Sequence, residues 1–117
     1  MKMFMKFSIQ LLDQPVLMED MVIMDGKRDR LEQLQTAVDD LIAVLHYGEG
    51  WALLMGDNAI GVYPSWRVPR HSKLFKFMPE HTYIKGAPVA TGPVLLVHDS
   101  GVDFGGFTQE QLMKLLR

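Results

Sequence analysis

The sequence predicts a single α+β domain built on a mainly antiparallel sheet. Several short runs alternate apolar with polar residues, which is the period of strands, and only two segments repeat apolar residues at helical spacing. The chain has 117 residues, a length that one hydrophobic core can serve. We therefore expect about five strands, one helix packed on a face of the sheet and a short C-terminal helix, all within one domain spanning residues 1–117.

The first predicted element is a hairpin. Residues 5–11 alternate between apolar and polar side chains, with Leu11 as the last apolar one, as in a half-buried strand. Pro15 then interrupts the run, because proline cannot donate a hydrogen bond to a neighbouring strand. A second apolar run over residues 16–24 supplies the returning strand.

A helix is predicted after this hairpin. Leu31, Leu34 and Val38 recur at a spacing that places them on one face, with polar residues between them. Asp29 and Glu32 stand three residues apart and resemble a capping pair, which satisfies the first free amides of a helix. The expected helix has about three turns.

The middle of the chain predicts a three-stranded meander. Residues 41–47 are apolar, rich in branched side chains and too few for a typical helix, so we expect a strand buried on both faces. The glycines of residues 48–50 allow a tight reversal into a strand over residues 51–55. A second turn at residues 56–58 leads to a short third strand over residues 59–63.

A long excursion follows, between Pro64 and Pro93. It contains five of the six prolines of the chain, so its regular elements must be short, with a small strand over residues 82–84. Its length exceeds that of an ordinary unstructured loop, which indicates embedded elements or a functional surface. Residues 93–98 form an apolar run that we place at the centre of the sheet, ended by a turn at residues 99–101.

The C-terminal helix has the clearest signals. Thr108 is expected as its N-cap with Gln111 as the reciprocal partner, and Phe107 can pack against Leu112 as a hydrophobic staple. Three leucines are expected to form its buried face: Leu112, Leu115 and Leu116.

Composition excludes several classes of function. The chain has no cysteine, so disulfides, cysteine nucleophiles and thiolate metal sites are excluded, and a cytoplasmic location is expected. A net charge of -2 provides no overall attraction to nucleic acid or anionic membranes. Lys6, Ser8 and Gln10 interrupt the apolar N-terminus, which therefore lacks the apolar stretch of a signal peptide, and no run is long enough to span a membrane.

No catalytic or metal-binding motif is present. His46 and His98 each follow an apolar strand run, and none of the four histidines has the short helical spacing of a metal pair. The adjacent carboxylates of Asp39 and Asp40 fit backbone capping better than magnesium binding, because neighbouring residues on a strand point apart. The glycine-rich stretches lack the residues of phosphate loops. We therefore predict a non-enzymatic protein with no catalytic residue, no metal and no cofactor.

The most distinctive segment spans residues 66–77, where basic residues recur every third position with aromatics between them. Basic side chains can bind the phosphates of single-stranded nucleic acid while aromatic rings stack on its bases. The same basic residues can also bind an acidic protein. A third interpretation is a solvated loop whose basic side chains shield aromatics that point into the core. The candidate partner-binding residues are Trp66, Arg67, Arg70, His71, Lys73 and Lys76.

Short stretches spread over most of the chain carry a family resemblance. They are Leu31-Glu32-Gln33-Leu34-Gln35 with Val38, the run Leu41 to Val44, Met55-Gly56-Asp57-Asn58, Ile84-Lys85-Gly86 with the run Thr91 to Val97, and Phe107-Thr108-Gln109-Glu110-Gln111-Leu112. In these stretches the chain resembles a family of small domains of unknown function found in bacteria, their plasmids and especially their phages. That family carries two glycines where this chain has Asp39 and Asp40, and residues 66–82 have no counterpart in it.

The resemblance implies no enzyme, and it suggests an accessory protein that binds and alters a host protein, including components of host defence. We therefore expect a small phage or mobile-element protein that binds a host or viral protein through residues 66–77. The alternatives are a nucleic-acid-binding module that uses the same residues and a small-molecule binder with a pocket between sheet and helix. A homodimer is also considered, because four aromatics are many for so small a core to bury: Trp51, Trp66, Phe104 and Phe107.

Overall fold

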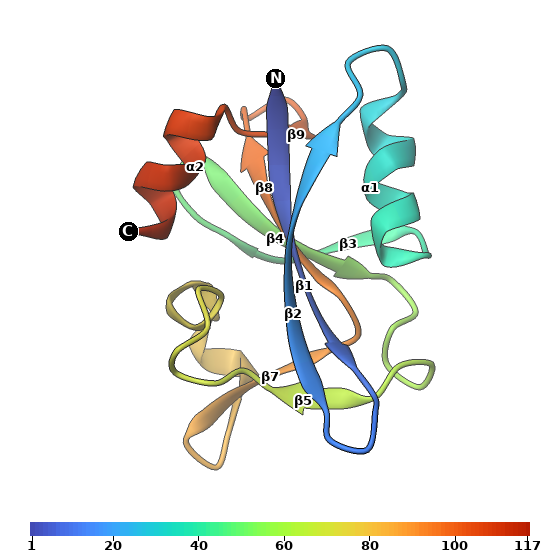
Figure 1. Cartoon of the computed structure of the whole chain (residues 1–117), viewed down its shortest axis with the longest axis vertical. Coiled ribbons are helices and arrows are strands. Elements are labelled where there is room, and N and C mark those ends of the chain that lie inside the picture. The colour runs from blue at the N-terminus through green and yellow to red at the C-terminus, as the bar shows by residue number, and fades with distance from the viewer.

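A six-stranded antiparallel sheet forms the centre of the protein in a computed structural model that describes residues 1–117 (Figure 1). One of the six strands, β9 (Phe104–Gly105), lies outside the main strand order and pairs with the end of β8 (Val94–Asp99). The α+β class and the antiparallel sheet predicted from the sequence are confirmed. The other five strands lie in the order β2 (Val16–Met24), β1 (Lys2–Gln10), β8 (Val94–Asp99), β4 (Trp51–Gly56) and β3 (Ile42–Tyr47).

One face of the sheet is covered by helix α1 (Arg30–Val38). The predicted N-cap is confirmed, because the Asp29 carboxylate accepts hydrogen bonds from the amides of Leu31 and Glu32. Of the three apolar residues predicted to share one face, Leu34 and Val38 are buried, whereas Leu31 is 49% exposed. The apolar core on this face consists of Phe4, Met24, Leu34, Val38, Ala52, Leu54, Leu95 and Val97.

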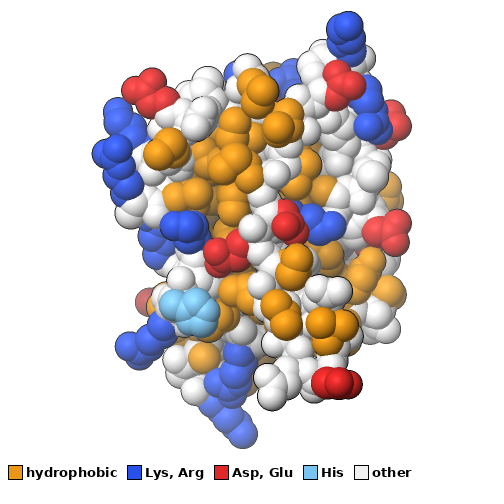
Figure 2. Space-filling view, in the orientation of Figure 1, with side chains coloured by type: hydrophobic (Ala, Val, Ile, Leu, Met, Phe, Trp, Pro, Cys, Tyr) orange, Lys and Arg blue, Asp and Glu red, His pale blue; other side chains and the backbone are white.

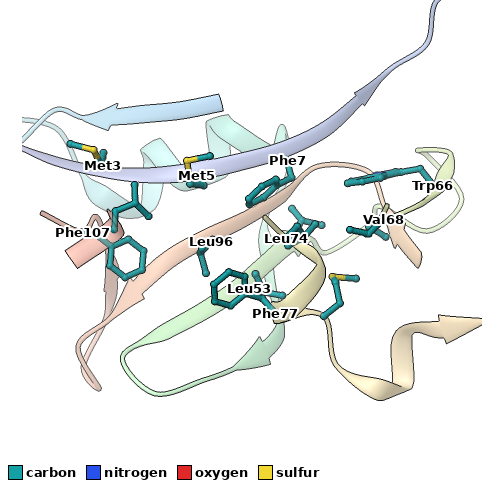
Figure 3. Close-up of a cluster of buried hydrophobic side chains, with 14 residues drawn as sticks. Met3, Met5, Phe7, Leu53, Trp66, Val68, Leu74, Phe77, Leu96 and Phe107 are labelled. Carbon is teal, nitrogen blue, oxygen red and sulfur yellow. The ribbon is translucent and has the colours of Figure 1, made fainter. Parts of the chain in front are cut away.

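The opposite face is covered by the excursion and by helix α2 (Gln109–Leu116). Figure 3 shows this larger core, in which side chains from β1, β8 and β4 meet those of the excursion. The predicted capping box of Thr108 and Gln111 is confirmed, while Leu112 is fully buried and the other two leucines are only half-buried. The core residues on this face are Met3, Met5, Phe7, Leu53, Trp66, Val68, Leu74, Phe77, Met78, Ala90, Val94, Leu96, Phe107 and Leu112.

The predicted first hairpin is confirmed, although β1 differs from the expectation in two ways. It begins at Lys2 rather than Met5, and Leu11 lies beyond its end with an exposed side chain. It is also buried on both faces, since Phe4 enters the α1 side while Met3 and Met5 enter the other. Alternation alone predicts one buried face, and the second arises because α1 packs back onto the sheet.

Two predictions for the middle of the chain are wrong. The strand β3 is not buried on both faces, because it forms an edge of the sheet, and all of its side chains are half-buried or exposed. Residues 59–63 form no strand, and only an isolated bridge joins Ile60 to Tyr63. The hairpin from β3 to β4 is present, but the other edge of β4 pairs with β8 instead of a third meander strand.

The excursion contains the short elements that its prolines predict. Its strands β5 (Ser65–Arg67), β7 (Ala87–Thr91) and β6 (Tyr83–Ile84) form a small sheet in that order. Two 3₁₀ turns lie between β5 and β6, at Phe75–Phe77 and Glu80–Thr82. The run predicted at the centre of the main sheet is confirmed there as β8, between β1 and β4. Neither helix is long and apolar enough to cross a membrane.

Candidate protein-binding surface

The excursion is held against the sheet by a buried tryptophan. Trp66 of β5 is only 7% exposed, and its indole N–H donates a 3.0 Å hydrogen bond to the carbonyl oxygen of Gly92. Figure 3 shows Trp66 at one end of the core, on the same side of β1 as Phe7 and Val68. The candidate partner-binding residue Trp66 is therefore a core residue, and its ring is not available for stacking on a base.

The burial of Trp66 fixes the direction of the two neighbouring side chains on β5. Successive side chains of a strand point to opposite faces, so the inward position of Trp66 turns Ser65 and Arg67 outward. Both are exposed, and Ser65 exchanges a 3.1 Å side-chain hydrogen bond with Thr91 on β7. Arg67 lies opposite Val89 in the same ladder and forms no ion pair. Its guanidinium is therefore free to contact a partner.

The segment carrying the next candidates is tied to β2. Ser72 is buried, and its hydroxyl donates a 2.7 Å hydrogen bond to the carboxylate of Glu19. The same carboxylate oxygen accepts a 3.2 Å bond from the backbone amide of Lys73. Arg70, His71 and the side chain of Lys73 remain exposed on both sides of this anchor. Their backbone is thus held in place while their charged ends reach solvent.

Lys76 has an internal role. Its ammonium donates to the backbone carbonyls of Leu115 and Arg117, at 2.7 and 2.6 Å, which satisfies free carbonyls at the end of α2. The ammonium also lies 5.1 Å from the centroid of the Phe77 ring. This candidate partner-binding residue therefore joins the excursion to α2.

The excursion carries a net positive charge, whereas the rest of the protein carries a net negative charge. Residues 64–93 contain five basic residues and one acidic residue, a net charge of +4, which leaves -6 for the remainder of a chain with net charge -2. Figure 2 shows basic side chains and a histidine gathered where the excursion lies, toward the lower left of the view. We define the cationic patch as the four exposed candidates whose side chains make no hydrogen bond in the structure: Arg67, Arg70, His71 and Lys73.

Sequence reasoning missed the two residues that anchor this patch. Glu19 interrupts the apolar run of β2, and the alternation of that run places it on the same face as Met21. That signal indicates a polar group beside apolar neighbours, but it does not identify Ser72 as the partner, 53 residues away. Gly92 contributes only a carbonyl oxygen to Trp66, and no side-chain pattern reports such a contact.

The histidines and aspartates considered as candidates for metal binding pack against aromatic rings or accept hydrogen bonds from neighbouring residues. The rings of His46 and His98 lie edge-on to Trp51 and Phe107, at centroid distances of 5.7 and 5.5 Å. The structure holds no group of three or more acidic residues and histidines close enough to bind a metal ion. Asp40 accepts hydrogen bonds from its neighbours, and the one from the Asn58 backbone amide is the largest cause that lowers the pKa of this carboxyl.

A cavity of about 650 Å³ lies at one end of the sheet rather than between sheet and helix. It is bordered by the start of β1, the loop between β2 and α1 and the turn after β8. Within it, Arg30 and Asp103 form a 2.7 Å ion pair, so two of its charged groups are already satisfied by each other. Smaller cavities lie between the sheet and each helix, one of about 440 Å³ beside α1 and one of about 400 Å³ beside α2.

The four aromatics that motivated a homodimer do not form an exposed surface. Trp66 and Phe107 are buried, and Trp51 packs edge-on against Phe77 with ring centroids 4.9 Å apart. Phe104 is half-buried beside Tyr47.

No protein-family model, curated protein or solved structure matches this chain. Functional inference therefore rests on its own residues.

Proposed function

We propose that the protein is a small non-enzymatic binding protein whose cationic patch docks on an acidic surface of another protein. In this proposal it acts in the bacterial cytoplasm as an accessory factor of a phage or mobile element, and its partner is a host or viral protein, such as a defence component. The observation that carries the binding surface is the net charge of +4 on an excursion whose backbone is anchored. The biological context rests on the family resemblance alone.

Anchoring supports a binding role because it lowers the entropic cost of association. A flexible basic loop loses conformational freedom when it docks, whereas Arg67 and Lys73 extend from a backbone that already has its hydrogen bonds. The patch also lacks internal ion pairs, since the two in the structure join Arg28 to Glu32 and Arg30 to Asp103. Its charges are therefore available to complementary carboxylates, which favours fast and specific encounter.

A nucleic-acid partner is supported less well by the same surface. Binding of single strands combines cationic contacts with aromatic rings on which bases stack. Of the aromatics in residues 66–77, Trp66 and Phe77 are buried and Phe75 is half-buried against the ring of Tyr83. The patch therefore offers charge without an open stacking platform, which fits an acidic protein surface better.

The test compares two charge-reversed variants with the wild type. Arg70→Glu with Lys73→Glu reverses the patch, and Lys27→Glu with Lys114→Glu makes the same change in charge at exposed sites elsewhere. Tagged proteins are incubated with bacterial lysate treated with nuclease, captured proteins are identified by mass spectrometry, and their affinities are measured after purification. We expect a protein that binds the wild type and the control variant and binds the patch variant at least about tenfold more weakly.

Nuclease-treated and untreated lysates separate the two classes of partner. Equal capture by the patch variant and the wild type would contradict the proposal. Capture that depends on intact nucleic acid, together with binding of labelled single-stranded DNA that weakens steeply with salt, would favour the nucleic-acid alternative. Circular dichroism melting of each variant checks that the substitutions leave the fold intact.

A further inference from the structure

The outer edge of the main sheet is a long strand with no neighbour. The strand β2 pairs with β1 over all nine of its residues, and nothing pairs with its other side. Natural proteins usually shorten, bend or cover such an edge, because its free amides and carbonyls can recruit another strand. Here the edge is longer than an average strand and has no register shift in its pairing with β1.

The pairing of β1 shows which backbone groups of β2 face outward. Met3 exchanges two hydrogen bonds with Phe107, at 2.8 and 2.7 Å, so the amide and carbonyl of Met3 point away from β2. Ile23 lies opposite Met3, and its own amide and carbonyl must therefore point away from β1. By alternation the same holds for every second residue, so the open row of donors and acceptors belongs to Leu17, Glu19, Met21 and Ile23.

Exposed apolar side chains accompany this open backbone. Met21 and Ile23 are 54% and 59% exposed, and they lie on the same face of the sheet as Met3 and Met5. Figure 2 looks onto this edge and shows hydrophobic side chains grouped in its upper half, with acidic side chains near its middle. A strand added to β2 would cover these apolar groups, and methionine adapts its shape to different partners.

The acidic residues of β2 argue against a second copy as the occupant. An antiparallel pair of two β2 strands that uses all nine residues places Asp20 directly opposite Asp20, and a shift by one residue on each strand in one direction places Glu19 opposite Glu19. The same shift in the other direction avoids like charges, but it places Asp20 opposite Val22, where its carboxylate gains no cationic partner. Like charges directly opposite each other destabilise a strand pair. Protection against self-pairing explains the exposed carboxylate of Asp20, but it does not explain why Met21 and Ile23 are exposed beside it.

We propose that β2 is a docking edge for an extended peptide segment of another protein, which adds to the sheet as an antiparallel strand. Its recognition chemistry follows from the residues it would face. Apolar side chains two residues apart would cover Met21 and Ile23, and a lysine or arginine would lie opposite Asp20. This surface adjoins the cationic patch at Glu19, which bonds to Ser72 and Lys73, but its Asp20 selects the opposite charge.

The experiment uses the full chain and a synthetic nine-residue peptide. The peptide has threonine and serine as background, valine at its second and fourth positions, opposite Ile23 and Met21, and lysine at its fifth position, opposite Asp20. Binding is followed by nuclear magnetic resonance of the protein amides. We expect shifts and slowed hydrogen exchange at the four outward amides of β2, and about five- to tenfold weaker binding when the lysine is replaced by glutamate.

Three controls test the mode of binding. N-methylation of the peptide at its fourth and sixth amides, which would pair with Met21 and Glu19, should abolish binding without changing peptide charge. The variant Asp20→Lys should reverse the preference and select the glutamate peptide. On the opposite edge of the sheet, Val44→Thr should leave binding unchanged, because Val44 belongs to β3.

Three outcomes would overturn the proposal. The first is no shift at the outward amides of β2 with millimolar lysine peptide. The second is equal binding of the lysine, glutamate and N-methylated peptides, which would mean that neither charge nor backbone pairing selects the ligand. The third is a dimer in sedimentation equilibrium that Asp20→Asn strengthens, which would assign the edge to a second copy of this chain.

Discussion

The hydroxyl of Ser72 donates a 2.7 Å hydrogen bond to the carboxylate of Glu19, and this bond joins the excursion to the edge strand β2. Ser72 also accepts a 3.1 Å bond from the amide of Leu74, while Glu19 accepts a second bond from the amide of Lys73. The exposed residues of the cationic patch thus flank a short polar network. The position of that patch depends on a residue of β2.

Removing either side chain of this pair should destabilise the protein. We expect Glu19→Ala and Ser72→Ala each to lower the free energy of unfolding by about 1 kcal/mol, because each leaves polar groups without a partner. The double variant should cost clearly less than the sum of the two, since the second substitution removes a group that is already unpaired. Urea unfolding of all four proteins measures this coupling, and strictly additive effects would show that the bond contributes nothing.

Lys76 should stabilise the protein through its hydrogen bonds to the carbonyls at the end of α2, and not through its charge alone. We expect Lys76→Met to lower the free energy of unfolding by about 1 kcal/mol, because the carbonyls of Leu115 and Arg117 lose their donor. Lys73→Met is the matched control, since the Lys73 side chain is exposed and makes no hydrogen bond in the structure. Thermal unfolding compares the two, and an equal loss in both would contradict this role.

Local signals in the sequence predicted the elements that depend on neighbouring residues. The capping box of Thr108, the N-cap at Asp29 and the hairpin around Pro15 all follow from chemistry within a few residues. The short elements of the excursion follow from the placement of its prolines. In each case the structure-forming contact lies close in sequence, so a pattern can report it.

Contacts between distant segments could not be predicted in the same way. Residues 41–47 look like a buried strand because they are apolar, but their burial depends on β3 lying at the edge of the sheet. The interleaved basic and aromatic residues of 66–77 fit a binding loop and a core segment equally well. Only the tertiary structure shows that Trp66 points inward, that Lys76 caps α2 and that the four residues of the cationic patch remain exposed.

Asp39 should tolerate glycine with a gain in stability. Its backbone is left-handed, with φ 54° and ψ 41°, at the end of α1, where glycine is the preferred residue. We expect Asp39→Gly to raise the free energy of unfolding by about 0.5 kcal/mol, and Asp39→Val to lower it by more than 1 kcal/mol, as roughly estimated for strained left-handed residues. Urea unfolding measures both, and a loss of stability in the glycine variant would show that the Asp39 side chain has an unrecognised role.

Asp40 should make the stability of the protein depend on acid pH. Its carboxylate accepts hydrogen bonds from the backbone amides of Asn58 and Leu41 and from the Asn58 side chain, at 2.7, 2.7 and 3.1 Å, which tie the end of α1 to the loop after β4. These bonds favour the ionised form, and the pKa of Asp40 is lowered from its ordinary value of 3.8. A carboxyl with a lowered pKa in the folded state stabilises the fold above its ordinary pKa, and that contribution is lost as the pH falls through the folded pKa.

The variant Asp40→Asn tests this linkage, because an amide occupies the same space without a charge. We expect it to have a lower Tm than the wild type at pH 7, with a difference that persists down to about pH 5 and shrinks from about pH 4 downward, where the wild-type carboxyl begins to take up a proton. Asp57→Asn serves as a control for loss of an exposed carboxylate, since the Asp57 side chain makes no hydrogen bond in the structure. A gap between wild type and Asp40→Asn that is the same at pH 7 and pH 3 would mean that the charge of Asp40 does not strengthen its bonds to Asn58 and Leu41.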